Sequence, residues 1–443
     1  MTGHTSLAGW GNTSRSLTTF IECSGAEAKG VLRDAGKLIP RGLGRGYGDC
    51  AVLGGGTTLR LRPTSRIVIS EGRAMVEGGV SLDELLTECI PLGLFLPVTP
   101  GTRFVTVGGA IAADVHGKNH HCDGTFGSHV EEIDLLTPSG DEVSLDPSDD
   151  LFWATVGGMG LTGVILRATI RLIKVETSYI RETSRRFKNL EELMLAMESA
   201  DKTNKYSVAW VDTLSRGEHL GRSVLSLGDH ASRSDLPRRY RREPLGYSSS
   251  PGISLPGLCH RMQIGARMAK LFNEAWYRKP SSSRRLRIVK LSSFFYPLDR
   301  IANWNIFYGR SGFVQHQFVV PDSASHVIVD AVEIMSKHKI PAYLSVLKRF
   351  GPANKGMLSF PLAGWTLATD IPATFPELSL VLDQLDEMVA ASGGRVYLAK
   401  DARLNSALVR RMYPELQEFS AYRRSIDPQL MMDSNLARRL FCD

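Results

Sequence analysis

The run Gly158-Met-Gly-Leu-Thr-Gly163 constrains the fold of this chain more than any other stretch. Its glycines have the spacing of a dinucleotide-binding turn, which requires a helix directly after the last glycine so that the pyrophosphate meets the helix N-terminus. Residues 164–172 instead alternate in a β-branched pattern that predicts a strand. We therefore expect a hairpin from residues 155–156 through this turn into that strand. The pattern disfavours a Rossmann NAD site, although the turn can still contact another cofactor.

The remaining pattern predicts an α+β fold. Residues 81–90 read as a helix that begins with a Ser-x-x-Glu capping box. Val130–Leu136 and Glu142–Leu145 are β-rich runs separated by a Pro-Ser-Gly-Asp turn, as in a β-hairpin. Composition changes near Val175, where we place a domain boundary. The strands and helices expected after it are 206–212, 313–320, 323–337 and 378–392, interrupted by a basic segment.

Composition excludes several classes of protein. No stretch approaches the ~18 consecutive apolar residues of a membrane span, and the N-terminus lacks the charged start and apolar block of an export signal. The six cysteines form no CxxC pair and have no metal-like spacing, which argues against a disulfide framework and a structural zinc site. We expect a protein that is cytoplasmic or peripheral at the cell membrane.

The positive charge is concentrated in residues 233–290. This segment contains fourteen Lys and Arg against three acidic residues, a net charge of +11, whereas the rest of the chain carries −4. Two interpretations remain open, a solvated loop face or a seat for phosphate or anionic lipid.

The densest glycine run lies in residues 40–49, where four glycines fall within seven positions and two arginines are interleaved. Successive backbone N–H groups in a tight concave turn attract a diphosphate, and glycine lets the backbone approach because no Cβ intervenes. The alternative is a flexible surface connection.

A second glycine cluster, residues 100–110, leads into three histidines and indicates a site for a flat group. His116 and His120 have the i, i+4 spacing of a metal pair on a helix. However, the residues between them suit a loop, and Lys118 would repel a cation, so we predict no metal. Hydrogen-bonded structural roles are the simpler interpretation of His120 and His121.

Residues 395–403 read as a strand that presents Lys400 and Asp401 at its end. Desolvation beside a pocket lowers the pKa of a lysine and makes it a usable base. A solvated cluster of Lys400, Asp401 and Arg403 is the alternative.

Together these motifs resemble the FAD-linked oxidoreductases of the vanillyl-alcohol oxidase type, and within them the oxidising subunits of decaprenylphosphoryl-ribose 2′-epimerases. The most specific part is His116-Gly-Lys-Asn-His-His121 followed by Phe126-Gly127. The other motifs lie in residues 9–11, 41–49, 100–102, 107–110, 151–158, 161–163, 313–317, 399–401 and 432–440.

The resemblance implies a two-domain fold. An FAD-binding domain would comprise residues 1–177 and 395–443, and a substrate domain of antiparallel sheet and helices would comprise residues 178–394. Because Arg45-Gly46-Tyr47 replaces the histidine through which related proteins often attach the flavin, we expect non-covalent FAD. The implied cofactor residues are Pro40, Arg41, Gly42, Leu43, Gly44, Arg45, Gly46, Tyr47, Gly48, Asp49, Cys50, Gly101, Thr102, Thr106, Val107, Gly108, Gly109, Ala113, Asp114, Val115, His116, Asn119, Ile165 and Tyr397.

The implied reaction is oxidation of the 2′-hydroxyl of a polyprenyl-phosphoryl β-D-ribofuranose to a ketone, the first half of epimerisation to the arabinose lipid used in cell-wall arabinan. Lys400, His116 and Tyr47 would be catalytic, whereas the implied substrate-binding residues are Lys118, Gln317, Lys348, Tyr296, Gln315 and Ala368. A separate NAD(P)H-dependent reductase would reduce the ketone. Peripheral membrane contact through residues 233–290 is expected, and nucleic acid is not.

The chain departs from these relatives at two positions. Ala368 stands where the relatives best known as inhibitor targets have a cysteine, so we predict activity without covalent trapping by thiol-reactive nitroaromatic inhibitors. Gly46 replaces a serine in the diphosphate loop. The loss of one hydrogen bond, with a net worth of about 1 kcal/mol, predicts somewhat looser FAD binding.

Two alternatives to this function remain open. The same flavin chemistry could act on a soluble nucleoside or an antibiotic-type sugar. A non-enzymatic binder of nucleic acid or lipid, driven by the basic segment, would lack the flavin spectrum.

Overall fold

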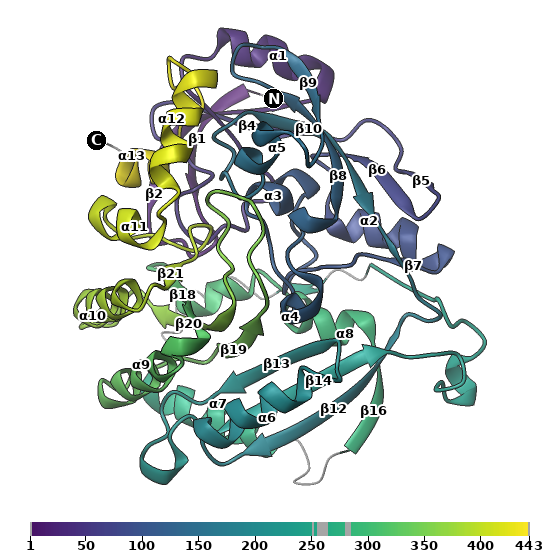
Figure 1. The fold of residues 1–443 in the computed structure, drawn as a ribbon, viewed down its shortest axis with the longest axis vertical. Helices are drawn as coiled ribbons and strands as arrows, with labels where there is room; N and C mark the ends of the chain where they lie inside the picture. The colour runs from purple at the N-terminus through teal and green to yellow at the C-terminus, as the bar shows by residue number, and fades with distance from the viewer. Residues whose placement is uncertain (1, 250–251, 255–264, 280–284, 442–443) are drawn as a thin grey trace.

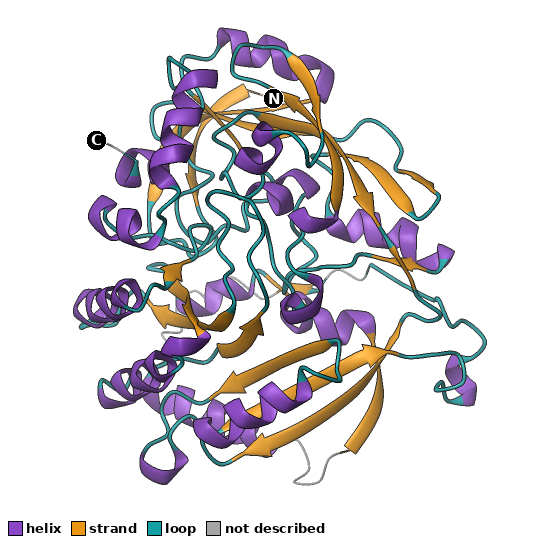
Figure 2. Ribbon diagram, viewed as in Figure 1, coloured by secondary structure: helices purple, strands orange, loops and turns teal. Residues whose placement is uncertain are grey.

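A computed structural model describes residues 2–249, 252–254, 265–279 and 285–441. The fold is α+β, as the sequence predicts. Segments from both ends of the chain form one half of the molecule, and the middle of the chain forms the other half around a large antiparallel sheet (Figure 1). Loops crowd the region between these halves (Figure 2).

The first half contains two main sheets. The first has the order β1-β2-β4-β3, in which β4 runs parallel to both of its neighbours. The second is antiparallel with the order β5-β6-β10-β8-β9. The strands are β1 (Thr2–Ala8), β2 (Arg15–Cys23), β3 (Leu38–Pro40), β4 (Thr57–Leu61), β5 (Val68–Ser70), β6 (Arg73–Glu77), β7 (Leu94–Phe95), β8 (Val130–Leu136), β9 (Glu142–Leu145), β10 (Val164–Arg171) and β11 (Ile173–Lys174). The helices are α1 (Gly25–Asp34), α2 (Leu82–Cys89), α3 (Val107–Ala112), α4 (His120–Asp123) and α5 (Asp150–Thr155).

Several predictions about this half are confirmed. Helix α2 begins with the expected capping box, in which Ser81 accepts from the Glu84 N–H and the Glu84 carboxylate accepts from the Ser81 N–H. Strands β8 and β9 form the expected hairpin. Strand β10, not a helix, follows Gly163. The hairpin expected from residues 155–156 is wrong, because α5 precedes the glycine turn and β10 pairs with β8 and β6.

The second half is built on an eight-stranded sheet with the order β16-β12-β14-β13-β19-β20-β18-β21. Strands change sheets after β11, close to the composition break at Val175. The strands are β12 (Tyr179–Phe187), β13 (Tyr206–Val211), β14 (Ser223–His230), β15 (Ile253–Ser254), β16 (Arg285–Lys290), β17 (Ile301–Ala302), β18 (Phe313–Pro321), β19 (Ser345–Phe350), β20 (Gly364–Pro372) and β21 (Arg395–Val396). The helices are α6 (Leu190–Ala200), α7 (Ala266–Arg278), α8 (Leu291–Phe295), α9 (His326–Lys337) and α10 (Leu378–Ala391).

One face of this sheet packs against helices, and the other faces the first half of the molecule. Alternate side chains along a strand point to opposite faces. Leu225, Leu347, Leu367 and Phe318 belong to the core with residues of α6, α9 and α10, three of the helices that contact this sheet. Their neighbours in sequence point to the opposite face, toward the first half of the molecule.

The end of the chain returns to its beginning through α11 (Ser406–Met412), α12 (Leu416–Ile426) and α13 (Asn435–Leu440), so that both termini lie in one half (Figure 1). Leu38 of β3 forms a parallel bridge with Met432. The Arg439 guanidinium contacts the Asp49 carboxylate at 2.8 Å. These contacts fix the ends of the loop that follows β3.

Candidate active site

A cavity of about 2360 Å³ lies between the two halves of the molecule. Its walls come from the loop after β3, from α3 and the glycine turn before β10, from the free face of the eight-stranded sheet, and from α7. Ordinary small-ligand sites occupy roughly 300–1,000 Å³. The cavity is therefore large enough for a cofactor and a substrate together.

The loop after β3 offers a row of unpaired backbone donors. Among the described residues, no protein acceptor pairs with the backbone N–H groups of residues 42–46. Gly44 has a φ of +67°, which favours glycine, and a Cβ at Gly42 would lie 2.2 Å from Thr106 Oγ1. The loop is held in place where the Tyr47 N–H donates to the Ala399 carbonyl at 2.9 Å. Such a nest of N–H groups suits an anionic diphosphate.

Most residues expected to contact a cofactor line this cavity. They are Pro40, Arg41, Gly42, Leu43, Gly44, Arg45, Gly46, Tyr47, Cys50, Gly101, Thr102, Thr106, Gly108, Gly109, Ala113, Val115, His116, Ile165 and Tyr397. The expected residues that fall outside the lining are Gly48, Asp49, Val107, Asp114 and Asn119.

The residues outside the lining brace the wall from behind. Asp114 is fully buried and accepts from the Gly127 N–H at 3.0 Å and from the Asn354 amide at 2.8 Å. Burial raises the pKa of the Asp114 carboxyl. The Asn119 amide donates to the Pro97 carbonyl at 2.8 Å. These groups position the loop that carries His116.

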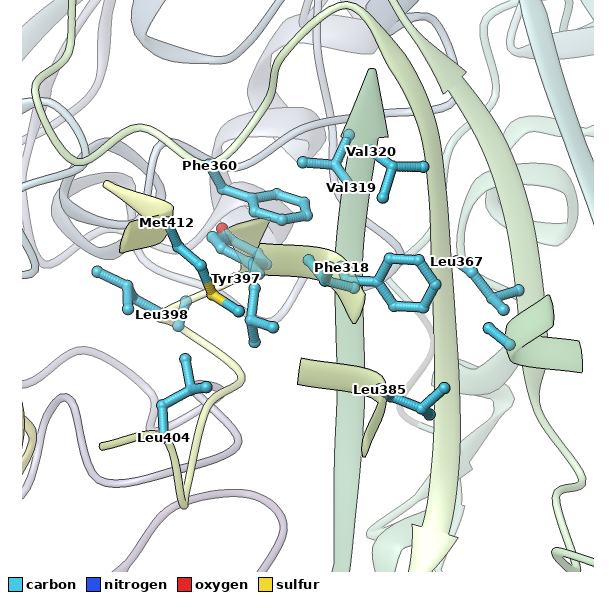
Figure 3. Close-up of a cluster of buried hydrophobic side chains, with 14 of the residues drawn as sticks. Phe318, Val319, Val320, Phe360, Leu367, Leu385, Tyr397, Leu398, Leu404 and Met412 are labelled. Carbon is cyan, nitrogen blue, oxygen red and sulfur yellow. The ribbon is translucent and has the colours of Figure 1, made fainter. Parts of the chain in front are cut away.

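A well-packed turn positions Lys400 in the cavity. The strand expected over residues 395–403 is only two residues long, because β21 ends at Val396 and the Lys400 N–H bonds back to the Tyr397 carbonyl at 2.9 Å. The Tyr397 ring stacks on Phe360 at 4.6 Å, within a buried cluster (Figure 3). The Tyr397 hydroxyl donates to the Ala113 carbonyl at 2.7 Å.

The Lys400 ammonium lies 5.3 Å from the centre of the Tyr47 ring. Burial lowers the pKa of Lys400 to about 8, and the nearby Asp370 carboxylate opposes that shift. Burial also raises the pKa of Tyr47 well above its usual value, so the phenol stays protonated. The expected catalytic residues Lys400, His116 and Tyr47 therefore line one cavity.

Asp370 is a site residue that the sequence analysis missed. It faces Gln315 across the β18–β20 pair, accepts from the Gln315 amide and also contacts the Tyr308 hydroxyl at 3.5 Å. Burial raises the pKa of the Asp370 carboxyl to about 7. Ala368 lies two residues earlier on the same face, so strand alternation was the signal that could have found Asp370.

His116 connects two strands of the sheet. The Thr366 hydroxyl donates to the Phe318 carbonyl at 2.8 Å, so it accepts from the Gln317 amide nitrogen at 3.0 Å. The same nitrogen then donates to His116 Nε2 at 3.0 Å, which leaves the hydrogen of the neutral ring on Nδ1.

Lys348 faces the other ring nitrogen, with its Nζ 3.4 Å from His116 Nδ1. Burial, Lys400 and Lys118 together lower the pKa of Lys348 to about 7. Burial and the two nearby lysines Lys348 and Lys400 lower the pKa of His116 well below its usual value. The histidine is therefore a neutral hydrogen-bonding group at physiological pH.

Some of the residues expected to bind substrate line the cavity, and others do not. Lys118 lines the cavity, donates to the Phe294 carbonyl and has a pKa lowered to about 8 by burial. Gln315, Lys348 and Ala368 also line it, whereas Gln317 reaches it through His116. Tyr296 does not line it, because its buried hydroxyl bonds to Thr99 Oγ1 at 2.7 Å.

Three lysines therefore converge on one cavity from three separate parts of the chain. Each has a lowered pKa because burial penalises the ammonium group. An anion among them would relieve that penalty. Within the described residues, no group of three His, Cys, Asp or Glu side chains could hold a metal ion. His120 and His121 have structural partners, the Gly351 N–H and the Asn204 carbonyl, each at 3.1 Å.

Comparisons with known proteins identify the cofactor. Residues 26–146, which include the N–H nest and α3, match the model of the FAD binding domain. The decaprenylphosphoryl-β-D-ribose oxidase of Mycolicibacterium smegmatis is 40% identical over 447 residues, covering 98% of this chain and 97% of that protein. The chain belongs to the FAD-linked oxidoreductases of the vanillyl-alcohol oxidase type.

Two further relatives cover less of the chain. An uncharacterised protein of Streptomyces coelicolor from the mprA 5′ region is 37% identical, covering 82% of this chain and all of that protein. An alditol oxidase from a Streptomyces species is 30% identical over 146 residues, 32% of this chain and 35% of its own length. That match is confined to a third of the chain.

The site fits the flavin on its own chemistry. The unpaired N–H groups of residues 42–46 can bind the diphosphate, and the small side chains of Gly108, Gly109, Ala112 and Ala113 leave room for a flat ring system. No helix within the described ranges is both long and apolar enough to cross a membrane.

Proposed function

We propose that this flavoprotein oxidises the 2′-hydroxyl of a polyprenyl-phosphoryl β-D-ribofuranose to the 2′-ketone. The observation that carries the proposal is the convergence of Lys118, Lys348 and Lys400 on the free face of the sheet, in the cavity that also contains the N–H nest. An oxidase of decaprenylphosphoryl-ribose that aligns with nearly the whole chain supports the same substrate class.

The cofactor is proposed to bind non-covalently. Residues 42–46 would hold its diphosphate, and Tyr397, fixed by Phe360 and Ala113, would support the ring system from the side of β21. FAD, when bound, supplies the acceptor for the hydride that leaves the sugar carbon.

Lys400 is proposed to take the hydroxyl proton. A neutral amine is the required form, and with a pKa of about 8 a substantial fraction of Lys400 is neutral near pH 8. Asp370 stabilises the ammonium group that forms on proton transfer, because its carboxylate favours the charged amine. Tyr47 remains a neutral phenol beside Lys400 and can orient the sugar.

Lys348, Gln317 and His116 are proposed to hold the sugar and phosphate oxygens. Among the residues that the structure describes, no carboxylate forms an ion pair with Lys348, whose Nζ lies 3.4 Å from His116 Nδ1. An approaching phosphate would raise its pKa and protonate it, which gives a charge-assisted hydrogen bond. His116 is held by Gln317 and can present its Nδ1–H.

The 2′-ketone needs a second enzyme to complete epimerisation. Hydride return to the opposite face of the carbonyl requires a separate NAD(P)H-dependent keto-reductase, and the product would be the arabinose lipid. This partner is inferred from the stereochemistry of the reaction.

The test is flavin bleaching under anaerobic conditions. Polyprenyl-phosphoryl ribose should bleach the FAD-loaded protein, whereas the same lipid without the sugar should not. A soluble nucleoside, an antibiotic-type sugar and a riboside without phosphate serve as comparisons. Rapid bleaching by a soluble nucleoside together with none by the lipid-linked sugar would overturn the proposed substrate in favour of the soluble alternative.

A further inference from the structure

Helix α7 presents an apolar stripe that the described residues of its own domain leave exposed. Met268, Leu271 and Phe272 lie on one side of the helix and are 52%, 68% and 43% exposed. Successive residues of an α-helix rotate by about 100°, so these three side chains, with Ala275, share one face. An exposed stripe of large apolar side chains on one helix is typical of an interaction surface.

The opposite side of α7 anchors it to the eight-stranded sheet. Asn273 is 1% exposed and donates to Asp212 at 2.7 Å, and Glu274 forms an ion pair with Arg222 at 2.8 Å. On the stripe side, the Phe272 ring contacts the Tyr343 ring edge-on, with centroids 5.9 Å apart. These contacts fix the helix in one orientation, in which its apolar stripe lines the cavity.

Positive charges surround this stripe. Arg267 is exposed on α7 one turn before Leu271, and Lys270 is exposed farther around the helix. Lys279 Nζ lies 4.5 Å from the centre of the Trp276 ring. On β16, Leu286 is 55% exposed and is followed by the exposed Arg287. Apolar side chains set among lysines and arginines have the composition of helices that lie in the interface of an anionic membrane.

The stripe is continuous with the active-site cavity. Met268, Leu271, Phe272, Trp276 and Leu286 line the same cavity as the three lysines. A bound polyprenyl chain that leaves the cavity past these residues would meet apolar surface throughout. This step rests on the proposed function, whereas the charge and exposure of α7 do not.

The geometry points to α7 and β16 as the face that docks the protein on an anionic lipid bilayer, with the mouth of the cavity opened toward the acyl chains. The docking face is defined by Arg267, Met268, Lys270, Leu271, Phe272, Trp276, Lys279, Leu286 and Arg287. Nucleic acid fits less well, because a polyanion would engage the charges and gain nothing from exposed Leu271 and Met268.

The experiment is flotation of the FAD-loaded full chain with phosphatidylcholine vesicles, with and without phosphatidylglycerol. We expect flotation with the anionic vesicles. Leu271→Ser should reduce the partition coefficient about tenfold, because a leucine no longer enters the interface. Arg267→Gln should reduce it about fivefold, the effect of one basic residue near an anionic surface.

Leu195→Ser is the matched control. Leu195 is 63% exposed on α6, which packs on the opposite face of the same sheet, so flotation of this variant should equal that of the parent. Flavin absorbance and thermal melting verify that each variant folds. Should Leu271→Ser not fold, quenching of Trp276 by brominated lipids in the parent protein, lost in Trp276→Phe, tests the same contact.

Several outcomes would overturn the docking face. These are no flotation with anionic vesicles, equal losses for Leu195→Ser and Leu271→Ser, or a dependence on Arg267 alone that added RNA abolishes, which would indicate a general polyanion surface. Vesicle binding uses no sugar, so its failure is separate from failure of the flavin bleaching test.

Discussion

Replacement of Lys348 by methionine should stabilise the cofactor-free protein and weaken its binding of phosphorylated sugar. The side chain points from β19 into the cavity, where its Nζ lies 3.4 Å from His116 Nδ1. Burial and two other lysines lower its pKa from 10.5 to about 7. The buried ammonium group of Lys348 therefore destabilises the folded chain relative to the unfolded chain, in which the group is solvated.

The size of that cost follows from the shift in pKa. Each unit corresponds to about 1.4 kcal/mol, so a group half protonated at pH 7 costs roughly 4 kcal/mol if the cavity is dry. Water can enter the cavity and screens part of this, which leaves about 2 kcal/mol. Methionine has a similar length and carries no charge, so Lys348→Met should raise the free energy of unfolding by about 2 kcal/mol at pH 7.

The dependence on pH has a definite sign. Between pH 7 and 10.5 the unfolded chain binds more protons at Lys348 than the folded chain does, so the stability of the parent rises with pH. The difference in free energy of unfolding between Lys348→Met and the parent should therefore decrease by about 1 kcal/mol between pH 7 and pH 9, with the same allowance for screening by water.

The assay is thermal unfolding of both apo-proteins at pH 7, 8 and 9 in buffers without phosphate. Lys355→Met, at an exposed lysine, is the control and should behave as the parent. Titration of the lipid-linked sugar into the flavin-loaded variant should show an affinity at least tenfold lower. A variant that melts below the parent at pH 7, or whose advantage is the same at pH 9, would refute the reasoning.

Four further outcomes are expected at the site. Lys400→Met should slow flavin reduction by about 10²–10⁴-fold in stopped-flow measurements, without loss of FAD, and an unchanged rate would remove Lys400 as the base. Asp370→Asn should move the limb of the pH–rate profile assigned to Lys400 to lower pH, because its carboxylate raises the pKa of that lysine; a shift to higher pH would contradict this. Mass spectrometry should find a nitroaromatic adduct on Ala368→Cys and none at Ala368 in the parent. The sequence alone predicts that the relatives' serine at position 46 would tighten FAD binding, but a Cβ at Gly46 would lie 2.7 Å from Cys50 Sγ; we therefore expect Gly46→Ser to bind FAD more weakly than the parent, and Cys50→Ala in the same chain to restore the affinity in equilibrium flavin titrations.

Local signals in the sequence predicted the elements that depend on few residues. The capping box of α2, the turn between β8 and β9, and the strand after Gly163 are each specified within about ten residues. The hairpin expected from residues 155–156 failed for a related reason. Helix α5 is six residues long, and a run so short has too little periodicity to separate a helix from a strand.

The candidate site could be predicted only in part, because its members meet through long-range pairing. The N–H nest is continuous in sequence, and its glycines are visible there. Asp370 meets Gln315 only because β18 pairs with β20, and Lys348 reaches His116 across 232 positions of the chain. Alternation along β20 indicates which of its side chains share a face, but nearby residues do not specify which strand pairs with it or which residue lies opposite.

The two faces of the eight-stranded sheet explain why cofactor and substrate recognition can change separately. On β20, Leu367 belongs to the core shared with α9 and α10, whereas Ala368 and Asp370 face the cavity. A substitution at Ala368 therefore alters what the substrate touches and leaves the packing behind the sheet in place. The N–H nest lies on a different sheet and depends on backbone groups, which side-chain substitutions on β20 do not reach. Under the proposed function, we expect the residues on the cavity face of β18, β19 and β20 to determine which sugar is accepted, while the loop after β3 binds FAD whichever sugar that is.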